Sequence, residues 1–194
     1  MRIFLTVLIL VFSLQSWTKA NDIGDFEIEG ITVGESLLDY YSEKEIKQMI
    51  SEETSIWYPT NAYVSILVKS NNFKTYEELG IVLDATNSRY IIHGIEGTFN
   101  YQDDIDECYK KQDIITSDLK NMFSNNVEFS SFKSKYKQDK SGKSFVKYND
   151  FYFTNGGAIR VICFDMNKDF IDPNDQLYLA INSKKFLDWL NKNM

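Results

Sequence analysis

Residues 145–165 read FVKYNDFYFTNGGAIRVICFD, and this stretch decides the fold class. Apolar and aromatic residues dominate on both sides of a short Asn-Gly-Gly segment. Asn-Gly is the favoured pair in hairpin turns where both turn residues need positive φ. The stretch therefore predicts two antiparallel strands over residues 145–154 and 158–165, joined by a tight turn at 155–157.

Other segments rich in β-branched and aromatic residues predict further strands. They span residues 26–28, 62–69, 79–84, 89–95 with a continuation through 98–101, and 177–182. Two of them, 79–84 and 89–95, form a second hairpin around residues 85–88. Clustered hairpins imply an antiparallel sheet, so the α+β class is favoured over α/β.

Helices are predicted in the middle and towards both ends of the chain. The longest covers residues 103–123, and its first turns carry acids that suit the positive end of the helix dipole. Residues 36–41 look helical after a turn-rich connector at 30–34. Ser42 and Glu45 have capping-box spacing and begin a helix through Ile50.

A last helix begins after Ser183, which is a suitable N-cap residue, and runs through Leu190. We therefore expect an antiparallel sheet of hairpins with a long central helix. The N- and C-terminal helices pack on this sheet, and residues 21–194 form a single α+β domain.

The first twenty residues, MRIFLTVLILVFSLQSWTKA, have the order of a secretory signal peptide. Arg2 gives a positive start, an apolar run follows, and small residues precede a predicted cleavage site after Ala20. The apolar run is shorter than the about 20 residues of a spanning helix, so a retained anchor is the less favoured alternative. We expect a periplasmic or secreted protein with no stable membrane insertion after cleavage.

Charge and motifs argue against several classes of protein. The chain has 21 basic and 28 acidic residues and a net charge of −7. Cleavage after Ala20 would remove two of these basic residues, Arg2 and Lys19, and make the net charge more negative. Such a surface repels nucleic acid. Gly142-Lys143-Ser144 looks like the end of a phosphate-binding loop, but Lys137 stands where that loop needs its first glycine. We therefore expect no cofactor and no nucleic-acid partner.

Cys108 and Cys163 are the two cysteines of the chain. In an oxidising compartment an even pair favours a disulfide over two buried thiols. Cys108 lies on the apolar face of the predicted long helix, and Cys163 shares a strand face with Ile159 and Val161. Both side chains would then enter one core, where they could meet.

Six lysines crowd residues 133–147, against one acid, Asp139. In an acidic protein this patch could bind a phosphate, an acidic glycan or an acidic surface of an envelope protein. The alternative is a solvated loop and edge strand whose lysines discourage aggregation. The residues expected at an anion or partner site are Lys137, Lys140, Ser141, Lys143 and Ser144.

Asp165, Asn167 and Asp169 have the spacing of the first half of a calcium loop. An EF-hand needs Gly at its sixth position and Glu at its twelfth, where this chain has Phe170 and Gln176. An acidic loop without metal is therefore favoured over a calcium site that is not an EF-hand.

His93 is the one histidine, and Ile91 and Ile95 flank it on the same predicted strand face. This favours a buried structural histidine. A Ser-His-Asp triad would need His93, but the sequence contains no G-x-S-x-G elbow. Several aromatic residues could either line a groove for sugars or fill a core, namely Trp57, Tyr58, Trp189 and residues 151–153.

Four segments carry a resemblance to a family. They are FEIEGITVGESLLDYYS at 26–42, CYKK at 108–111, DKSGKS at 139–144 and FLDWL at 186–190. Together they resemble uncharacterised small exported proteins of marine alphaproteobacteria. The resemblance implies one unit exported from a Gram-negative cell, and it supplies no catalytic residue.

These observations favour a noncatalytic periplasmic binding or interaction module. The alternatives are an exported carboxylate-dependent hydrolase, with or without calcium assistance, and a structural role in envelope assembly. The hydrolase would need two converging acids in a deep pocket, at least one of them with a raised pKa.

Overall fold

The computed structural model describes residues 22–76, 78–123 and 127–194. The predicted signal peptide, residues 1–20, lies outside the described residues. Among the residues that are described, no helix is both long and apolar enough to cross a bilayer.

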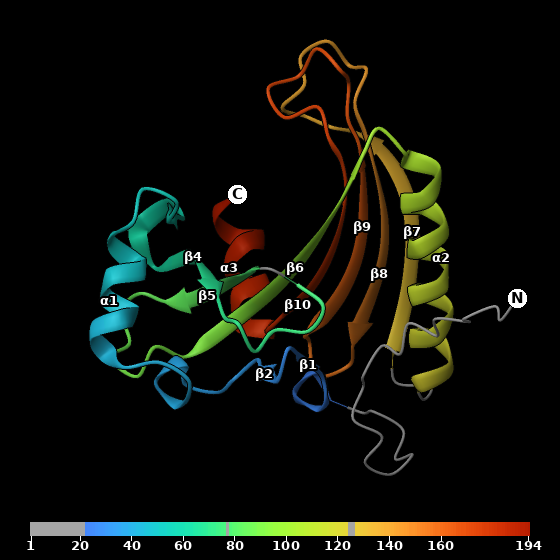
Figure 1. Cartoon of the computed structure of the whole chain (residues 1–194). Helices are drawn as coiled ribbons and strands as arrows, with labels where there is room; N and C mark the ends of the chain where they lie inside the picture. Colours follow the sequence, from blue (N-terminus) through green and yellow to red (C-terminus); the bar gives the residue numbers. More distant parts are fainter. Residues whose placement is uncertain (1–21, 77, 124–126) are drawn as a thin grey trace, which may run out of the picture.

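An eight-stranded antiparallel sheet forms the centre of the protein (Figure 1). A separate two-stranded sheet pairs β1 (Glu27–Ile28), which confirms the strand predicted at 26–28, with β2 (Ile31–Thr32), which lies in the segment predicted as a connector. Mixed α+β structure is thereby confirmed. The order in the large sheet is β3 (Ile56–Trp57), β4 (Tyr63–Lys69), β5 (Glu78–Asp84), β6 (Ile92–Gln102), β10 (Asp175–Asn182), β9 (Ala158–Asp165), β8 (Phe145–Phe153) and β7 (Val127–Lys135).

Within the described residues, three α-helices accompany the sheet: α1 (Glu43–Ser51), α2 (Ile105–Met122) and α3 (Lys184–Asn193). The capping box predicted for α1 is present, because the Ser42 and Glu45 side chains each bond the other's backbone. Ser183 caps α3 as expected. The helix predicted at residues 36–41 is a single 3-10 turn, η2 (Leu37–Asp39), and two further 3-10 turns are η1 (Ile23–Asp25) and η3 (Pro59–Asn61).

The hairpin of residues 145–165 forms with the expected strands, but its turn differs from the expected one. The Phe153 backbone N–H donates to the Gly157 carbonyl at 2.9 Å, and the Gly156 N–H donates to the Phe153 carbonyl at 2.8 Å, which closes a loop of three residues. Within that loop only Gly156 has a positive φ, of 95°. The prediction of positive φ at two residues was therefore wrong, and the turn is the three-residue type that needs one left-handed glycine.

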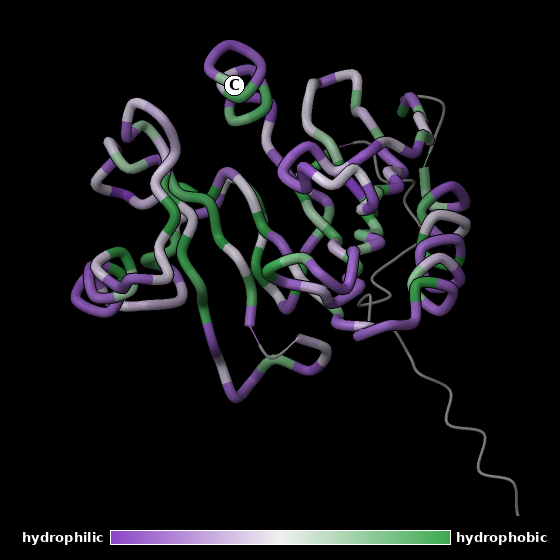
Figure 2. Tube along the Cα trace, turned by 90° about the horizontal axis from the view of Figure 1, so that it is seen from above, coloured by the Kyte–Doolittle hydropathy of each residue, from purple (hydrophilic) through white to green (hydrophobic). Residues whose placement is uncertain are grey.

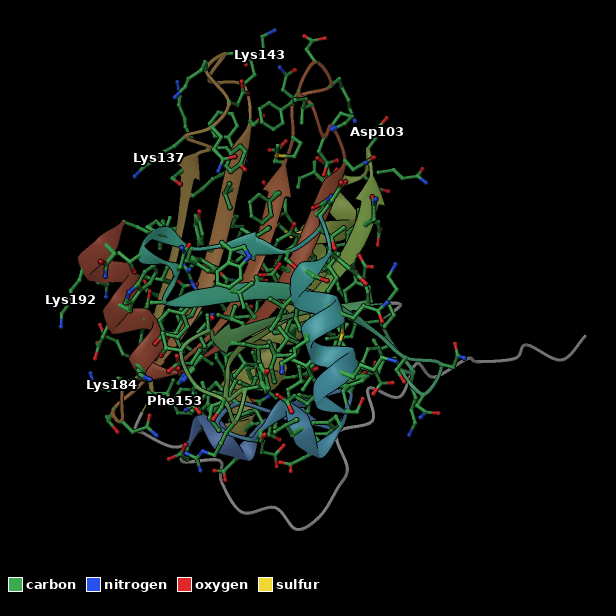
Figure 3. The ribbon with its side chains drawn as sticks, turned by 90° about the vertical axis from the view of Figure 1, so that its left-hand side faces the viewer. Asp103, Lys137, Lys143, Phe153, Lys184 and Lys192 are labelled. Atoms are coloured by element: carbon green, nitrogen blue, oxygen red, sulfur yellow. A yellow bond between two sulfur atoms is a disulfide. The ribbon has the colours of Figure 1, made fainter. Side chains whose placement is uncertain are left out.

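Alternate residues of each strand point to the two sides of the sheet. On the core side, strand residues such as Val64 and Val161 pack with Ile46 of α1 and Leu119 of α2. On the opposite side, here called the α3 side, a smaller cluster joins Phe186 of α3 to strands β4 and β5. Figure 3 shows α1 and α3 on opposite sides of the sheet, and Figure 2 shows the apolar residues concentrated along the strands.

A disulfide joins Cys108 of α2 to Cys163 of β9 and confirms the predicted pairing. The two Cα atoms are 6.1 Å apart, within the usual range for this bond. Both residues are fully buried in the core between α2 and the sheet. The bond therefore fixes helix α2 to β9, the second strand of the hairpin at residues 145–165.

Polar contacts continue this attachment along α2, one and two turns after its cysteine. The Gln112 amide nitrogen donates to the carbonyls of Lys147 and Val161 at 2.9 and 2.8 Å. The Thr116 hydroxyl accepts from the Asn149 amide at 2.9 Å. The seam between α2 and the sheet thus carries specific polar contacts where an apolar helix face was expected.

Candidate functional site

The lysines of residues 133–147 do not form one patch. Lys133 and Lys147 lie on strands β7 and β8 and contact α2 or its neighbours, whereas the lysines of the predicted site lie on the loop between these strands. Lys133 lies 3.1 Å from the Asp165 carboxylate and donates to the Tyr109 hydroxyl at 2.9 Å. Lys147 pairs with Asp113 of α2 at 3.1 Å. These two ammonium groups are therefore compensated on the core side, next to α2.

The remaining lysines of the predicted site lie on the loop between β7 and β8. Lys137 and Lys143 point away from the body of the protein at the end of the sheet (Figure 3). Lys143 lies 3.8 Å from Asp169, and Lys140 contacts the Lys137 carbonyl at 3.4 Å. Their ammonium groups are exposed and do not converge on a common point.

The polar groups of the same loop are used to hold its shape. Asp139 is buried, and its carboxylate accepts from the Ser141 backbone at 2.8 Å and from the Ser144 backbone and hydroxyl at 2.9 and 2.7 Å. These bonds hold the pKa of Asp139 well below its usual range. Ser144 is fully buried, so it serves the loop fold instead of offering the anion-binding donors predicted for it.

The three oxygen-bearing residues proposed for calcium have separate partners. Asp165 binds Lys133, Asn167 donates from its backbone to the Ser144 hydroxyl at 2.9 Å, and Asp169 faces Lys143. No group of three acidic, histidine or cysteine residues in the described part of the chain is arranged to hold a metal ion. The placement thus favours the acidic-loop interpretation.

His93 is buried, but it points to the α3 side instead of the face of its neighbouring isoleucines. The pairing of β6 with β5 shifts register between Val82 and Leu83, which leaves His93 as the extra residue of a β-bulge. Such a bulge re-aims a side chain. Its Nδ1 lies 2.8 Å from the hydroxyl of Ser183, the cap of α3, and burial lowers the pKa of His93.

This Ser-His contact is structural and is not part of a triad. The nearby carboxylate of Asp84 bonds Lys185 at 2.6 Å and Thr86 at 2.7 Å, and no hydrogen bond joins it to His93 among the described residues. The Ser183 hydroxyl is also occupied by the backbone of Phe186 at 3.2 Å. The pair therefore attaches α3 to the sheet.

Part of the α3 side is not covered by a helix and forms the best candidate site. Helix α3 packs over β4 and β5 and contacts β6, which leaves the strands towards β7 uncovered on this side. We call this uncovered region the open face. It is defined by Glu96, Phe132, Tyr148, Arg160, Ile162 and Tyr178.

Strand register arranges the open face in two neighbouring rows. In the first row Tyr178, Ile162, Tyr148 and Phe132 stand opposite one another on β10, β9, β8 and β7. In the second row the corresponding residues are Glu96, Ala180, Arg160 and Asp150 on β6, β10, β9 and β8. An apolar, aromatic row thus lies beside a charged one.

The β7 end of the open face is a stacked aromatic and guanidinium platform. Phe132, which is 46% exposed, stacks on Tyr148 with ring centroids 4.7 Å apart. The Arg160 guanidinium lies 5.3 Å from the Tyr148 ring and forms two bonds of 3.1 Å to Asp150. Tyr152 donates to the same carboxylate at 3.0 Å. The charge of Arg160 is therefore balanced within the sheet.

The other end of the open face holds a carboxylate with no compensating charge. Glu96 is half-buried where the region covered by α3 meets the open face, and burial alone raises its pKa. Among the described residues, no hydrogen bond or ion pair joins it to another group. Its charge acts on Tyr58 and Tyr178, and burial together with this charge raises the pKa of Tyr178 to about 12.

Among the described residues, the acids whose pKa is raised, Glu96 and Asp175, do not form the paired arrangement expected of a glycosidase. Asp175 has a pKa raised by burial and by the neighbouring charge of Asp165. However, Asp175 is buried with a bond of 2.9 Å from the Met166 backbone, and Asp165 is paired with Lys133. A surface hollow of about 410 Å³ lies elsewhere, at the end of α1 beside β4.

The expected aromatic groove is only partly present. Phe151 and Phe153 fill the core, and Tyr58 and Trp189 pack around α3 with ring centroids 5.9 Å apart. Of the predicted run, Tyr152 alone reaches the α3 side, 40% exposed. Sequence reasoning missed Glu96, Tyr148, Arg160 and Tyr178, whose only signal was their alternation with core residues along predicted strands.

Comparison with known proteins adds no assignment to this geometry. No protein-family model matches the sequence, and no curated protein matches it significantly.

Proposed function

We propose that this chain is a noncatalytic binding module that holds its ligand on the open face. The supporting observation is the contrast between the two sides of one sheet: the core side is packed by α1 and α2, whereas half-exposed rings of Phe132, Tyr148 and Tyr178 remain uncovered on the other side. Aromatic rings left at a surface in this way supply large contact area for a ligand.

The compartment in the proposal is the periplasm or the extracellular space, reached after cleavage of a signal peptide following Ala20. The Cys108–Cys163 disulfide supports it, because structural disulfides persist in oxidising compartments. The resemblance to exported proteins of marine alphaproteobacteria supports the same compartment. The proposed binding module uses no cofactor, and its ligand is not a nucleic acid.

A hydrolase is the second candidate, and the charges of the open face argue against it. Carboxylate-dependent hydrolysis of a glycoside needs two carboxylates that act together on one bond. Here Asp150 is neutralised by Arg160, and no second carboxylate is among the causes that raise the pKa of Glu96. A single acid on this face suits recognition better than bond cleavage.

The test is a titration of the ¹⁵N-labelled, oxidised protein with soluble sugars and aryl alcohols, followed by NMR chemical shifts. Binding should change the chemical shifts of the open-face residues, and Phe132→Ser should weaken this binding. Phe129→Ser is the matched control, because Phe129 is 37% exposed on the core side of the same strand.

Shifts confined to the loop of residues 136–144 would contradict the open face and would favour the lysine loop. Each binding compound should also be recovered chemically unchanged by chromatography after incubation. A cleaved product would overturn the noncatalytic assignment and support the hydrolase.

A further inference from the structure

Glu96 is the group on the open face whose environment is least satisfied by the protein itself. Its carboxylate is half-buried, and within the described chain no donor or cation contacts it. Gly80 and Ala180 flank it on the neighbouring strands, so no long side chain of these two positions approaches it. Removing a carboxylate from water without a partner is costly, and a bound cation would offset that cost.

The balance of charges around the open face is negative. Arg160 is paired with Asp150, so it cannot serve Glu96. Lys69, which projects from β4 on the same side, is paired with Glu78 at 3.1 Å, and Lys185 of α3 is paired with Asp84. The whole chain is also acidic, with a net charge of −7, which draws cations towards it.

Aromatic groups around this carboxylate suit an organic cation, and strand register makes Tyr178 a diagonal cross-strand neighbour of Glu96. Tyr58 and Tyr178 both lie within the influence of its charge. Tyrosine rings attract ammonium groups through their π-electrons, in addition to the attraction of a carboxylate. From Tyr178 the apolar row continues over Ile162 and Tyr148 to Phe132, a span of about 14 Å at the usual strand spacing.

We infer that the open face binds a small organic ammonium compound with an apolar, ring-containing body. The ammonium group lies at Glu96 between Tyr58 and Tyr178, and the body lies along the row towards Tyr148. This inference rests on the proposed function, since it places the ligand on the same face, and it adds the chemical class of that ligand. A neutral sugar would leave the Glu96 charge uncompensated.

The experiment compares 2-phenylethylammonium with 2-phenylethanol, its neutral counterpart, by NMR titration of the oxidised protein at pH 7. The ammonium compound should bind about tenfold more tightly than the alcohol and should perturb Glu96, Tyr178 and Ala180. Glu96→Gln should remove this preference. Glu128→Gln is the matched control, because Glu128 is an exposed acid of β7 on the α3 side of the sheet. This variant should retain the preference for the ammonium compound.

The outcomes separate the inference from the proposed function. If both compounds perturb the open face equally and Glu96→Gln changes neither affinity, the cation assignment is overturned while open-face binding stands. If neither compound perturbs the open face, the inference is overturned and the proposed face loses support as well. Thermal unfolding of Glu96→Gln checks that the variant is folded, and the loss of a half-buried charge should not lower its stability.

Discussion

Removing the Cys108–Cys163 cross-link should lower the free energy of unfolding by about 4 kcal/mol. The bond joins residues 55 positions apart, and the chain-entropy model gives about this value for a loop of that length. Reduction leaves both buried sulfur atoms in place, so it isolates the cross-link. The double variant Cys108→Ala/Cys163→Ala also creates two voids, each costing about 1 kcal/mol.

Urea unfolding of the oxidised, reduced and double-variant proteins measures these terms separately. A loss of about 4 kcal/mol corresponds to a fall in Tm of about 8 to 16 °C for a chain of this size. The m-value should rise when the bond is absent, because the unfolded chain then exposes more surface. The double variant should be the least stable of the three.

Equal urea midpoints and m-values for the oxidised and reduced proteins would refute this reasoning. Mass spectrometry provides the control for the starting state. Under denaturing conditions, alkylation should add mass to the protein only after reduction. Alkylation of the untreated protein would mean that the two thiols are free.

Three further changes test other parts of the structure. Glu96→Gln should raise Tm at pH 7. The folded-state pKa of Glu96 lies above its ordinary 4.5, so the protonated side chain stabilises the wild type near and below pH 4.5. The wild type loses this stability as the pH rises through the raised pKa. The difference in Tm between the two proteins should therefore vanish below about pH 4. Asp150→Asn should cost about 2 to 3 kcal/mol in urea unfolding, less than a fully buried pair, because the Arg160 side chain is 28% exposed. Gly97→Ala should cost about 1 to 3 kcal/mol by the same measurement, because its new Cβ would lie 2.4 Å from the buried Tyr76 ring.

Local patterns predicted most of the strands and helices. The hairpin at residues 145–165, the capping box at Ser42 and the long helix are each encoded within a few neighbouring residues. The cysteine pairing was also accessible, because each cysteine lay on an apolar face. In contrast, β7 was not predicted as a strand, since its serines, lysines and phenylalanines lack a clear period-two pattern.

Long-range pairing was the part that the sequence did not reveal. The bulge at His93 moves this side chain away from the core side, and no local motif marks it. Gln112 and Thr116 looked like ordinary polar helix positions, yet both are buried against the sheet. Each of these features depends on which residues face each other across distant strands.

The open face has the same origin, which explains why a search for motifs could not find it. Tyr178, Ile162, Tyr148 and Phe132 come from four strands, and only the register between those strands sets them in one row. The adjacent residues Ile162 and Cys163 show how closely this row depends on the opposite side of the sheet. Cys163 points to α2 and carries the disulfide, whereas Ile162 points to the open face.

The disulfide and the candidate site therefore share a strand, and the first should stabilise the second. Anchoring Cys163 to α2 holds β9 in position, and Gln112 adds bonds to the carbonyls of β8 and β9. These are the strands that carry Tyr148, Arg160 and Ile162 on the other side. Because the ligand proposed for the open face would contact several strands, its affinity would depend on their fixed spacing. The proposed binding and the proposed oxidising compartment would then be linked through one covalent bond.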